Sequence, residues 1–259
     1  MGMKTKKDIV DNWLPRYTGT ALEDFGDYII LVNFSAYVYT FAKWHGVETK
    51  GEDRSMLSAT AENITIINFG MGSPNAGTIV DLLTAVMPKA LIFLGKCGGI
   101  KSKKNKVGDL ILPIAAIRGE GTSNDYLPPE VPALPAFALQ KAISTTIREY
   151  NQDYWTGTIY TTNKRVWEHR TDFKKYLKSL RPIAIDMETA TIFVAAFKNH
   201  IPAGALLLVS DMPMVPDGVK TEASDKAVTS NFMDTHLKIG IDSLKQLING
   251  TQTIKHLRF

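Results

Sequence analysis

The sequence predicts an α/β fold in which helices cover both faces of a mixed or parallel β-sheet. Two observations lead to this class. Short runs rich in β-branched residues and bounded by turn residues recur along the chain, as in buried strands. Stretches with apolar residues at helical spacing lie between them. Such an alternation of strands and helices is typical of an α/β sandwich.

Six runs predict strands. Their apolar character is nearly continuous, as expected when a sheet is covered on both faces. In chain order they span residues 28–32, 63–69, 90–94, 109–112, 154–160 and 205–209.

Three stretches predict helices. The first, 79–86, ends before Pro88, and the second, 187–197, ends before Pro202, since proline interrupts a helix. The third spans residues from about 228 to 247.

The length of 259 residues suits one large α/β domain. With 44% hydrophobic and 22% charged residues, the composition excludes disordered and fibrous classes. The sequence shows no internal repeat and no linker, and the proline-rich segment 128–135 predicts a stiff loop. We therefore expect a single domain over residues 1–259.

The formal net charge of +4 makes nucleic acid and small anions candidate partners. The basic residues are dispersed, however, and the densest run, 101–106, predicts a solvated loop between two strands. No apolar stretch approaches the roughly 18 residues that a membrane span needs, and the first residues lack the core of a signal peptide. We expect a cytoplasmic protein that binds neither a membrane nor nucleic acid.

The single cysteine, Cys97, excludes an intramolecular disulfide and fits a reducing compartment. Because no histidine lies near it in sequence, we interpret Cys97 as a small buried residue rather than a nucleophile. The five histidines show no metal-ligand spacing. Neither a metal nor a cofactor is therefore expected.

A glycine-rich segment, 69–75, follows a predicted strand and leads into a helix. Gly70 and Gly72 would let backbone N–H groups approach an anion at the helix N-terminus. The segment departs from a dinucleotide fingerprint because Asn75 replaces the third glycine and Pro74 lacks an N–H group. An anion-binding loop and a purely structural turn both remain open.

The segment 94–99 predicts a flexible turn that carries Lys96 at the end of an apolar strand. Ligands of open α/β sheets gather at such strand ends. The segment lacks the spacing of a nucleoside-triphosphate loop.

Three carboxylates also fall at strand ends: Asp186, Glu188 and Asp211. A carboxyl group at an apolar rim has a raised pKa, which suits a general acid near neutral pH. Helix capping by Asp186 and turn formation by Asp211 are equally compatible with the residues alone.

Taken in this order, the segments resemble the nucleoside phosphorylase and nucleosidase superfamily over nearly the whole chain. Within it, the chain is most similar to the bacterial AMP nucleosidases, in a short form without their extra N-terminal regulatory domain. The residues that carry the resemblance are the glycine loop 70–74, the turn 95–99, the strand 107–112, the uridine-phosphorylase-like loop 119–132, the Met-Glu pair 187–188 and the Ser-Asp pair 210–211.

The resemblance implies a three-layer sandwich with a mixed, partly closed central sheet, and a homo-oligomer, either a hexamer or a dimer. It implies hydrolysis of AMP to adenine and ribose 5-phosphate, with inorganic phosphate as an effector. Glu188 would hold the ribose diol, Met187 would pack on the sugar, and Asp211 would protonate or hydrogen-bond N7 of the base. These roles suit the cleavage of an N-ribosidic bond, in which charge develops on the ribose and on the leaving base.

Water is favoured over phosphate as the nucleophile, because Phe93 and Lys96 stand where related phosphorylases have a phosphate-binding arginine and serine. A lysine replaces the bidentate arginine only as a point charge. A purine or uridine nucleoside phosphorylase remains the alternative, followed by a non-catalytic nucleotide- or RNA-binding protein. Thioadenosine nucleosidases activate water with an N-terminal glutamate, but Asn33 ends the corresponding strand here, so the water-activating group stays unassigned.

The 5′-phosphate of a nucleotide needs cations, and the candidates are Arg54, Lys96, Arg118 and Arg165. Thr122 or Ser123 could add hydroxyl donors. Arg54 lies in a segment that resembles one reaching a neighbouring subunit's site in hexameric purine phosphorylases. Trp167 or Tyr160 could stack on the base, although core packing is the alternative for Tyr160. The candidate substrate-binding residues are Met187, Ser210, Gly70, Gly72, Lys96, Gly98, Arg54, Arg118, Thr122 and Trp167.

Overall fold

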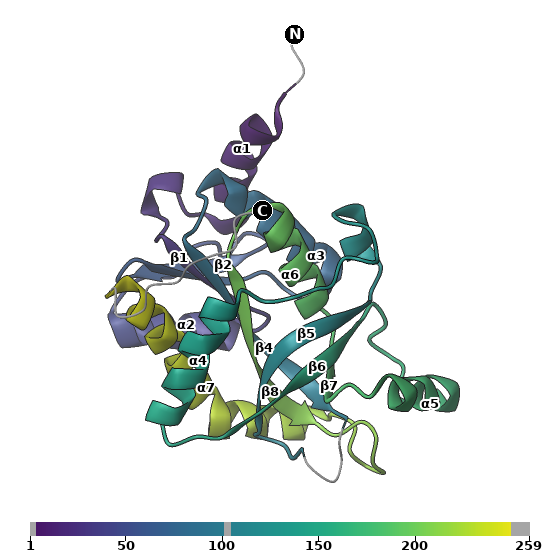
Figure 1. The fold of residues 1–259 in the computed structure, drawn as a ribbon. Coiled ribbons are helices and arrows are strands. Elements are labelled where there is room, and N and C mark those ends of the chain that lie inside the picture. Colours follow the sequence, from purple (N-terminus) through teal and green to yellow (C-terminus); the bar gives the residue numbers. More distant parts are fainter. Residues whose placement is uncertain (1–3, 101–104, 250–259) are drawn as a thin grey trace.

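A mixed β-sheet forms the centre of the molecule in the computed structural model, which describes residues 4–100 and 105–249 (Figure 1). The order of its strands is β2-β3-β1-β4-β7-β6-β5-β8, and β8 also pairs with β4. This second pairing closes part of the sheet on itself. The strands are β1 (Tyr28–Val32), β2 (Leu57–Ala61), β3 (Ile64–Asn68), β4 (Ala90–Gly99), β5 (Leu110–Gly119), β6 (Tyr154–Thr162), β7 (Ala184–Asp186) and β8 (Ala203–Asp211).

Helices cover both faces of the sheet. Because successive strand residues point to opposite faces, one strand contributes side chains to both apolar cores. Leu91 and Phe93 of β4 join the apolar core beneath α1, α3 and α6. Ile92 and Leu94 join the core beneath α2, α4 and α7. The long helices are α1 (Lys6–Thr18), α2 (Ser35–His45), α3 (Ser73–Leu82), α4 (Phe137–Glu149), α5 (Thr171–Leu180), α6 (Thr189–Lys198) and α7 (Glu222–Ile248). The predicted three-layer sandwich with a partly closed mixed sheet is confirmed.

The six strand predictions are confirmed, but the predicted turn at 95–99 is wrong. These residues continue β4 to Gly99, because β8 pairs with β4 from Leu91 to Gly98 and β7 pairs with its last two residues. Helices α1, α2, α4 and α5 and strands β2 and β7 were not predicted. Of the basic run 101–106, residues 101–104 lie outside the described residues. Among the described helices, none is both long and apolar enough to cross a membrane.

A buried histidine ties α7 to α2 and β8. His236 Nδ1 lies 2.9 Å from the Tyr37 hydroxyl, and its Nε2 lies 2.9 Å from the Leu206 carbonyl oxygen. Because a carbonyl only accepts, Nε2 carries the proton and Nδ1 accepts from the tyrosine. Burial, and to a smaller extent the charge of Lys96, lower the pKa of His236 to about 4, while the hydrogen bond to Leu206 acts against this shift.

We expect this histidine to make the fold sensitive to acid. An unfolded histidine takes up a proton near pH 6.5, whereas His236 resists protonation down to about pH 4. Its contribution to stability is therefore complete above pH 6.5 and is lost as the pH falls toward 4, by about 3 kcal/mol at most. Urea unfolding at several pH values should show this loss of unfolding free energy, and the loss should be smaller in His236→Gln. In the control His169→Gln, an exposed position, the loss should equal that of the wild type, and equal losses in both variants would contradict the assignment.

Candidate active site

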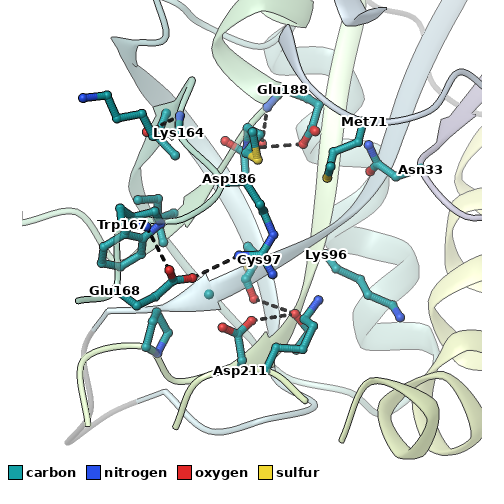
Figure 2. A pocket seen from close by; sticks show the side chains of 18 of the residues that line it. Asn33, Met71, Lys96, Cys97, Lys164, Trp167, Glu168, Asp186, Glu188 and Asp211 are labelled. Carbon is teal, nitrogen blue, oxygen red and sulfur yellow. Dashed lines mark hydrogen bonds and ion pairs between the residues drawn. The ribbon is translucent and has the colours of Figure 1, made fainter. Parts of the chain in front are cut away.

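Most of the predicted site residues that the structure describes lie around one pocket at the carboxyl ends of β1, β4, β6, β7 and β8 (Figure 2). β4 is parallel to its neighbours β1 and β8, so the carboxyl ends of these three strands meet at one edge. The antiparallel pairing of β4 with β7 then brings the start of α6 to the same edge. Of the predicted site residues, the pocket is lined by Met187, Glu188, Lys96, Gly98, Trp167, Ser210 and Asp211, together with the candidate cation Arg165.

Glu188 lies at one end of the pocket, and only 4% of its surface is exposed. The Gly72 N–H donates to Glu188 Oε1 over 2.7 Å. Gly72 has φ of +96°, a conformation that favours glycine, so this residue type lets the loop present its N–H to the carboxylate. Burial, and then the charge of Asp186, raise the pKa of Glu188 to about 8.

The Asp186 side chain accepts hydrogen bonds from the first turn of α6. Its carboxylate accepts from the Thr189 N–H over 2.8 Å and from the Thr161 hydroxyl over 2.7 Å. Burial raises the pKa of Asp186, while these donors oppose the shift. Asp186 therefore accepts from the first N–H group of α6, although the N-cap residue of this helix is Glu188.

Asp211 ends β8 at the opposite end of the pocket. The Ser210 hydroxyl donates to Asp211 Oδ1 over 2.9 Å. Burial raises the pKa of Asp211, although the charge of Lys220 and the Ser210 hydrogen bond act against this. A carboxyl group that holds its proton to higher pH than usual is suited to act as a general acid.

Lys96 lies on the pocket wall with its ammonium group already occupied. Its Nζ donates to Asp225 Oδ1 and to the Thr229 hydroxyl, each over 2.8 Å, and lies 4.2 Å from the centroid of the Phe34 ring. Lys220 Nζ lies 3.4 Å from the same Asp225 oxygen. Two ammonium groups therefore share one carboxylate, with the Lys96 side chain only 2% exposed.

Two of the predicted glycines border the pocket rather than line it. Gly70 and Gly72 belong to the connection between β3 and α3, and Met71 between them reaches the pocket. The Asn33 side chain donates to the Gly70 carbonyl over 2.9 Å, which ties this connection to the end of β1.

Three further candidates are not brought to the pocket. Thr122 begins a short 3-10 helix, Thr122–Asp125, outside the pocket lining. Arg118 directs all five N–H donors at its own loop, to Ser123, Asn124, Leu127, Pro128 and Val131. Arg118 therefore has no donor left for a ligand. The Arg54 side chain is 48% exposed and its Nε lies 3.3 Å from the adjacent Asp53.

Trp167 lies almost fully buried in the loop after β6 and packs edge-on against Phe173, with ring centroids 5.4 Å apart. Tyr160 belongs to the same apolar cluster and does not line the pocket, so its interpretation as a core residue is confirmed. Cys97 is also buried, and burial raises the pKa of its thiol well above the usual value, as expected for an inert residue.

Sequence reasoning missed several pocket residues, among them Glu168 and Lys220. Glu168 follows the candidate Trp167 directly, which was the available signal. Lys220 lies nine residues beyond Asp211 in an irregular segment, and nothing local marked it. Within the described part of the chain, no three His, Cys, Asp or Glu side chains gather in a way that could hold a metal ion.

The model of the Phosphorylase superfamily matches residues 27–245, and the chain belongs to this family.

Two relatives are nucleosidases. The AMP nucleosidase of Escherichia coli K12 is 28% identical over 90% of this chain. The chain spans only 57% of the length of that relative. The crystal structure of AMP nucleosidase from Bacteroides thetaiotaomicron shares 55% sequence identity, with a TM-score of 0.85, and the match covers 96% of this chain and 100% of that one.

A third match shows the fold alone. The crystal structure of uridine phosphorylase from Vibrio fischeri is 20% identical with a TM-score of 0.77, over 89% of this chain and 96% of that chain.

Proposed function

We propose that this chain hydrolyses the N-ribosidic bond of AMP to adenine and ribose 5-phosphate. The observation that carries the proposal is the pair of carboxyl groups at the two ends of one pocket, the buried Glu188 and the partly buried Asp211. The names of the relatives from Escherichia coli and Bacteroides thetaiotaomicron support AMP as the substrate. The single cysteine still favours a reducing compartment such as the cytoplasm.

Each carboxyl group would meet one requirement of the reaction. Glu188, once ionised, accepts hydrogen bonds from the two ribose hydroxyls and orients the sugar, with Met187 packed beside it. Asp211, while protonated, donates to N7 and neutralises the charge that gathers on the departing base. Because charge develops at both places only as the bond breaks, both contacts stabilise the transition state more than the ground state.

The environment of Lys96 favours water over inorganic phosphate as the nucleophile. Asp225 and Thr229 hold its ammonium group, and Phe93 is fully buried against Phe69. Neither residue therefore offers the free, bidentate donor set that binds a phosphate ion in place.

Base release from AMP and from adenosine, each with and without inorganic phosphate, tests the proposal. Adenine and ribose 5-phosphate formed from AMP without phosphate is the expected result. Cleavage only in the presence of phosphate, with ribose 1-phosphate as product, would instead make the chain a nucleoside phosphorylase. Phosphate that changes the rate without entering the product would support its role as an effector.

The 5′-phosphate would be held partly by a neighbouring copy in a homo-oligomer. Arg54 lies outside its own chain's pocket and is half-exposed, which leaves its guanidinium available to another subunit. Arg54→Ala should then raise the KM for AMP about tenfold, in line with the loss of one charge-assisted contact. The exposed Lys50→Ala should not.

Mixed oligomers distinguish a shared pocket from a local effect. Oligomers that combine Arg54→Ala subunits with inactive Asp211→Asn subunits should recover low-KM activity, because the second subunit supplies Arg54 to the intact pocket of the first. Mixtures no better than the sum of the separate variants would remove Arg54 from the site of a neighbour.

A further inference from the structure

The pocket contains another carboxylate that the proposed mechanism does not use. Glu168 lies in the loop between β6 and α5, next to Trp167, and lines the pocket. Figure 2 shows Glu168 and Asp211 at the same end of the pocket, whereas Glu188 lies at the other end. The two groups interact electrostatically, since the charge of Glu168 contributes to the raised pKa of Asp211.

Glu168 is held in a defined orientation. The backbone N–H of Trp167 donates to Glu168 Oε2 over 2.9 Å, and Arg165 Nη1 donates to Glu168 Oε1 over 3.0 Å. Its side chain is only 12% exposed. A carboxylate only accepts hydrogen bonds, and each of its oxygens keeps a second lone pair for a ligand.

The two carboxyl groups match one edge of one kind of purine. Adenine presents N7, an acceptor, beside its 6-amino group, a donor, whereas a 6-oxopurine presents two acceptors along the same edge. Asp211, as the proton donor to N7, and the Glu168 carboxylate would offer this edge a donor and an acceptor. A 6-oxo group facing Glu168 would meet a second acceptor and leave both oxygens unpaired.

We propose that Glu168 accepts a hydrogen bond from the 6-amino group of the purine and so selects adenine over 6-oxopurines. This inference rests on the proposed function, because it takes Asp211 to bind N7. Glu168 is then the residue that determines which base the enzyme accepts, and Arg165 is a positioning residue that holds its carboxylate.

Binding of free adenine and hypoxanthine, measured by calorimetry on the wild-type chain and on Glu168→Gln, tests this directly. We expect the wild type to bind adenine at least about tenfold more tightly, as one unpaired buried polar group costs about 1–3 kcal/mol. In Glu168→Gln the amide can turn to offer either a donor or an acceptor, so the preference should fall below about threefold. The ratio of kcat/KM for AMP and IMP should change in parallel. Glu130→Gln, an exposed carboxylate outside the pocket, is the matched control.

Equal affinity of the wild type for both bases, or a preference that survives in Glu168→Gln, would overturn the inference. If Glu168→Gln does not fold, wild-type binding of unsubstituted purine decides, because purine lacks the 6-amino group and should bind about tenfold more weakly than adenine. The binding experiments do not need turnover. Failure to cleave AMP would therefore reject the proposed function separately from the assignment of Glu168.

Discussion

Asp211→Asn is expected to lower kcat for AMP by about 10²- to 10⁴-fold, the usual contribution of a general acid. Asparagine can still donate a hydrogen bond to N7, but it has no proton to transfer to the departing base. The Ser210 hydroxyl, which donates to Asp211 Oδ1, can donate equally to the amide oxygen. The fold should therefore persist, and circular dichroism and thermal melting should show no loss of stability.

The pH profile separates this role from a merely structural one. Burial raises the pKa of Asp211, so the protonated acid persists to higher pH than an ordinary aspartate and is lost as the pH rises further. The limb of kcat/KM that falls with rising pH through this pKa should be absent in Asp211→Asn. The exposed Asp217→Asn should keep both the rate and the limb. An Asp211→Asn enzyme with wild-type turnover would remove Asp211 from the mechanism.

Glu188→Gln is the second large effect, and it should damage binding and rate together. An amide accepts only one of the two hydrogen bonds that the carboxylate accepts from the ribose hydroxyls, and it carries no charge to balance the sugar cation. We expect KM to rise and kcat to fall, with a combined loss of about 10²-fold or more in kcat/KM. The amide oxygen can still accept from the Gly72 N–H, so the loop geometry should remain.

A stability measurement checks the same residue without substrate. The pKa of Glu188 is raised to about 8 in the folded chain, above its ordinary value of 4.5. Its contribution to stability is therefore complete below pH 4.5 and is lost as the pH rises through 8. Glu188→Gln has no such ionisation, so its melting temperature should gain on that of the wild type between pH 5 and pH 8. Unchanged kinetics, or a melting difference independent of pH, would contradict the assignment.

Much of the fold could be predicted from local sequence, because burial on both faces makes each strand a continuous apolar run. The residues of β1 were predicted without error, and the cores of β3, β4, β5, β6 and β8 were also found. Helices α1, α2, α4 and α5 were not predicted, although α4 and α5 have a clear amphipathic pattern that local sequence carries. Local sequence does not show which helices meet in the fold: the Tyr37–His236 hydrogen bond, for example, joins α2 to α7.

The sequence by itself determined the buried strands and the carboxyl groups at their ends, since both depend on residue type and short spacing. Only the tertiary structure decided which charges remain available. Lys96 donates to Asp225, which lies 129 residues further along the chain, and the Arg118 guanidinium donates to residues of its own loop. Glu168 reaches the same pocket end as Asp211 from the loop between β6 and α5. The physical reason is that the availability of a polar side chain depends on its neighbours in space, and closure of the sheet sets those neighbours.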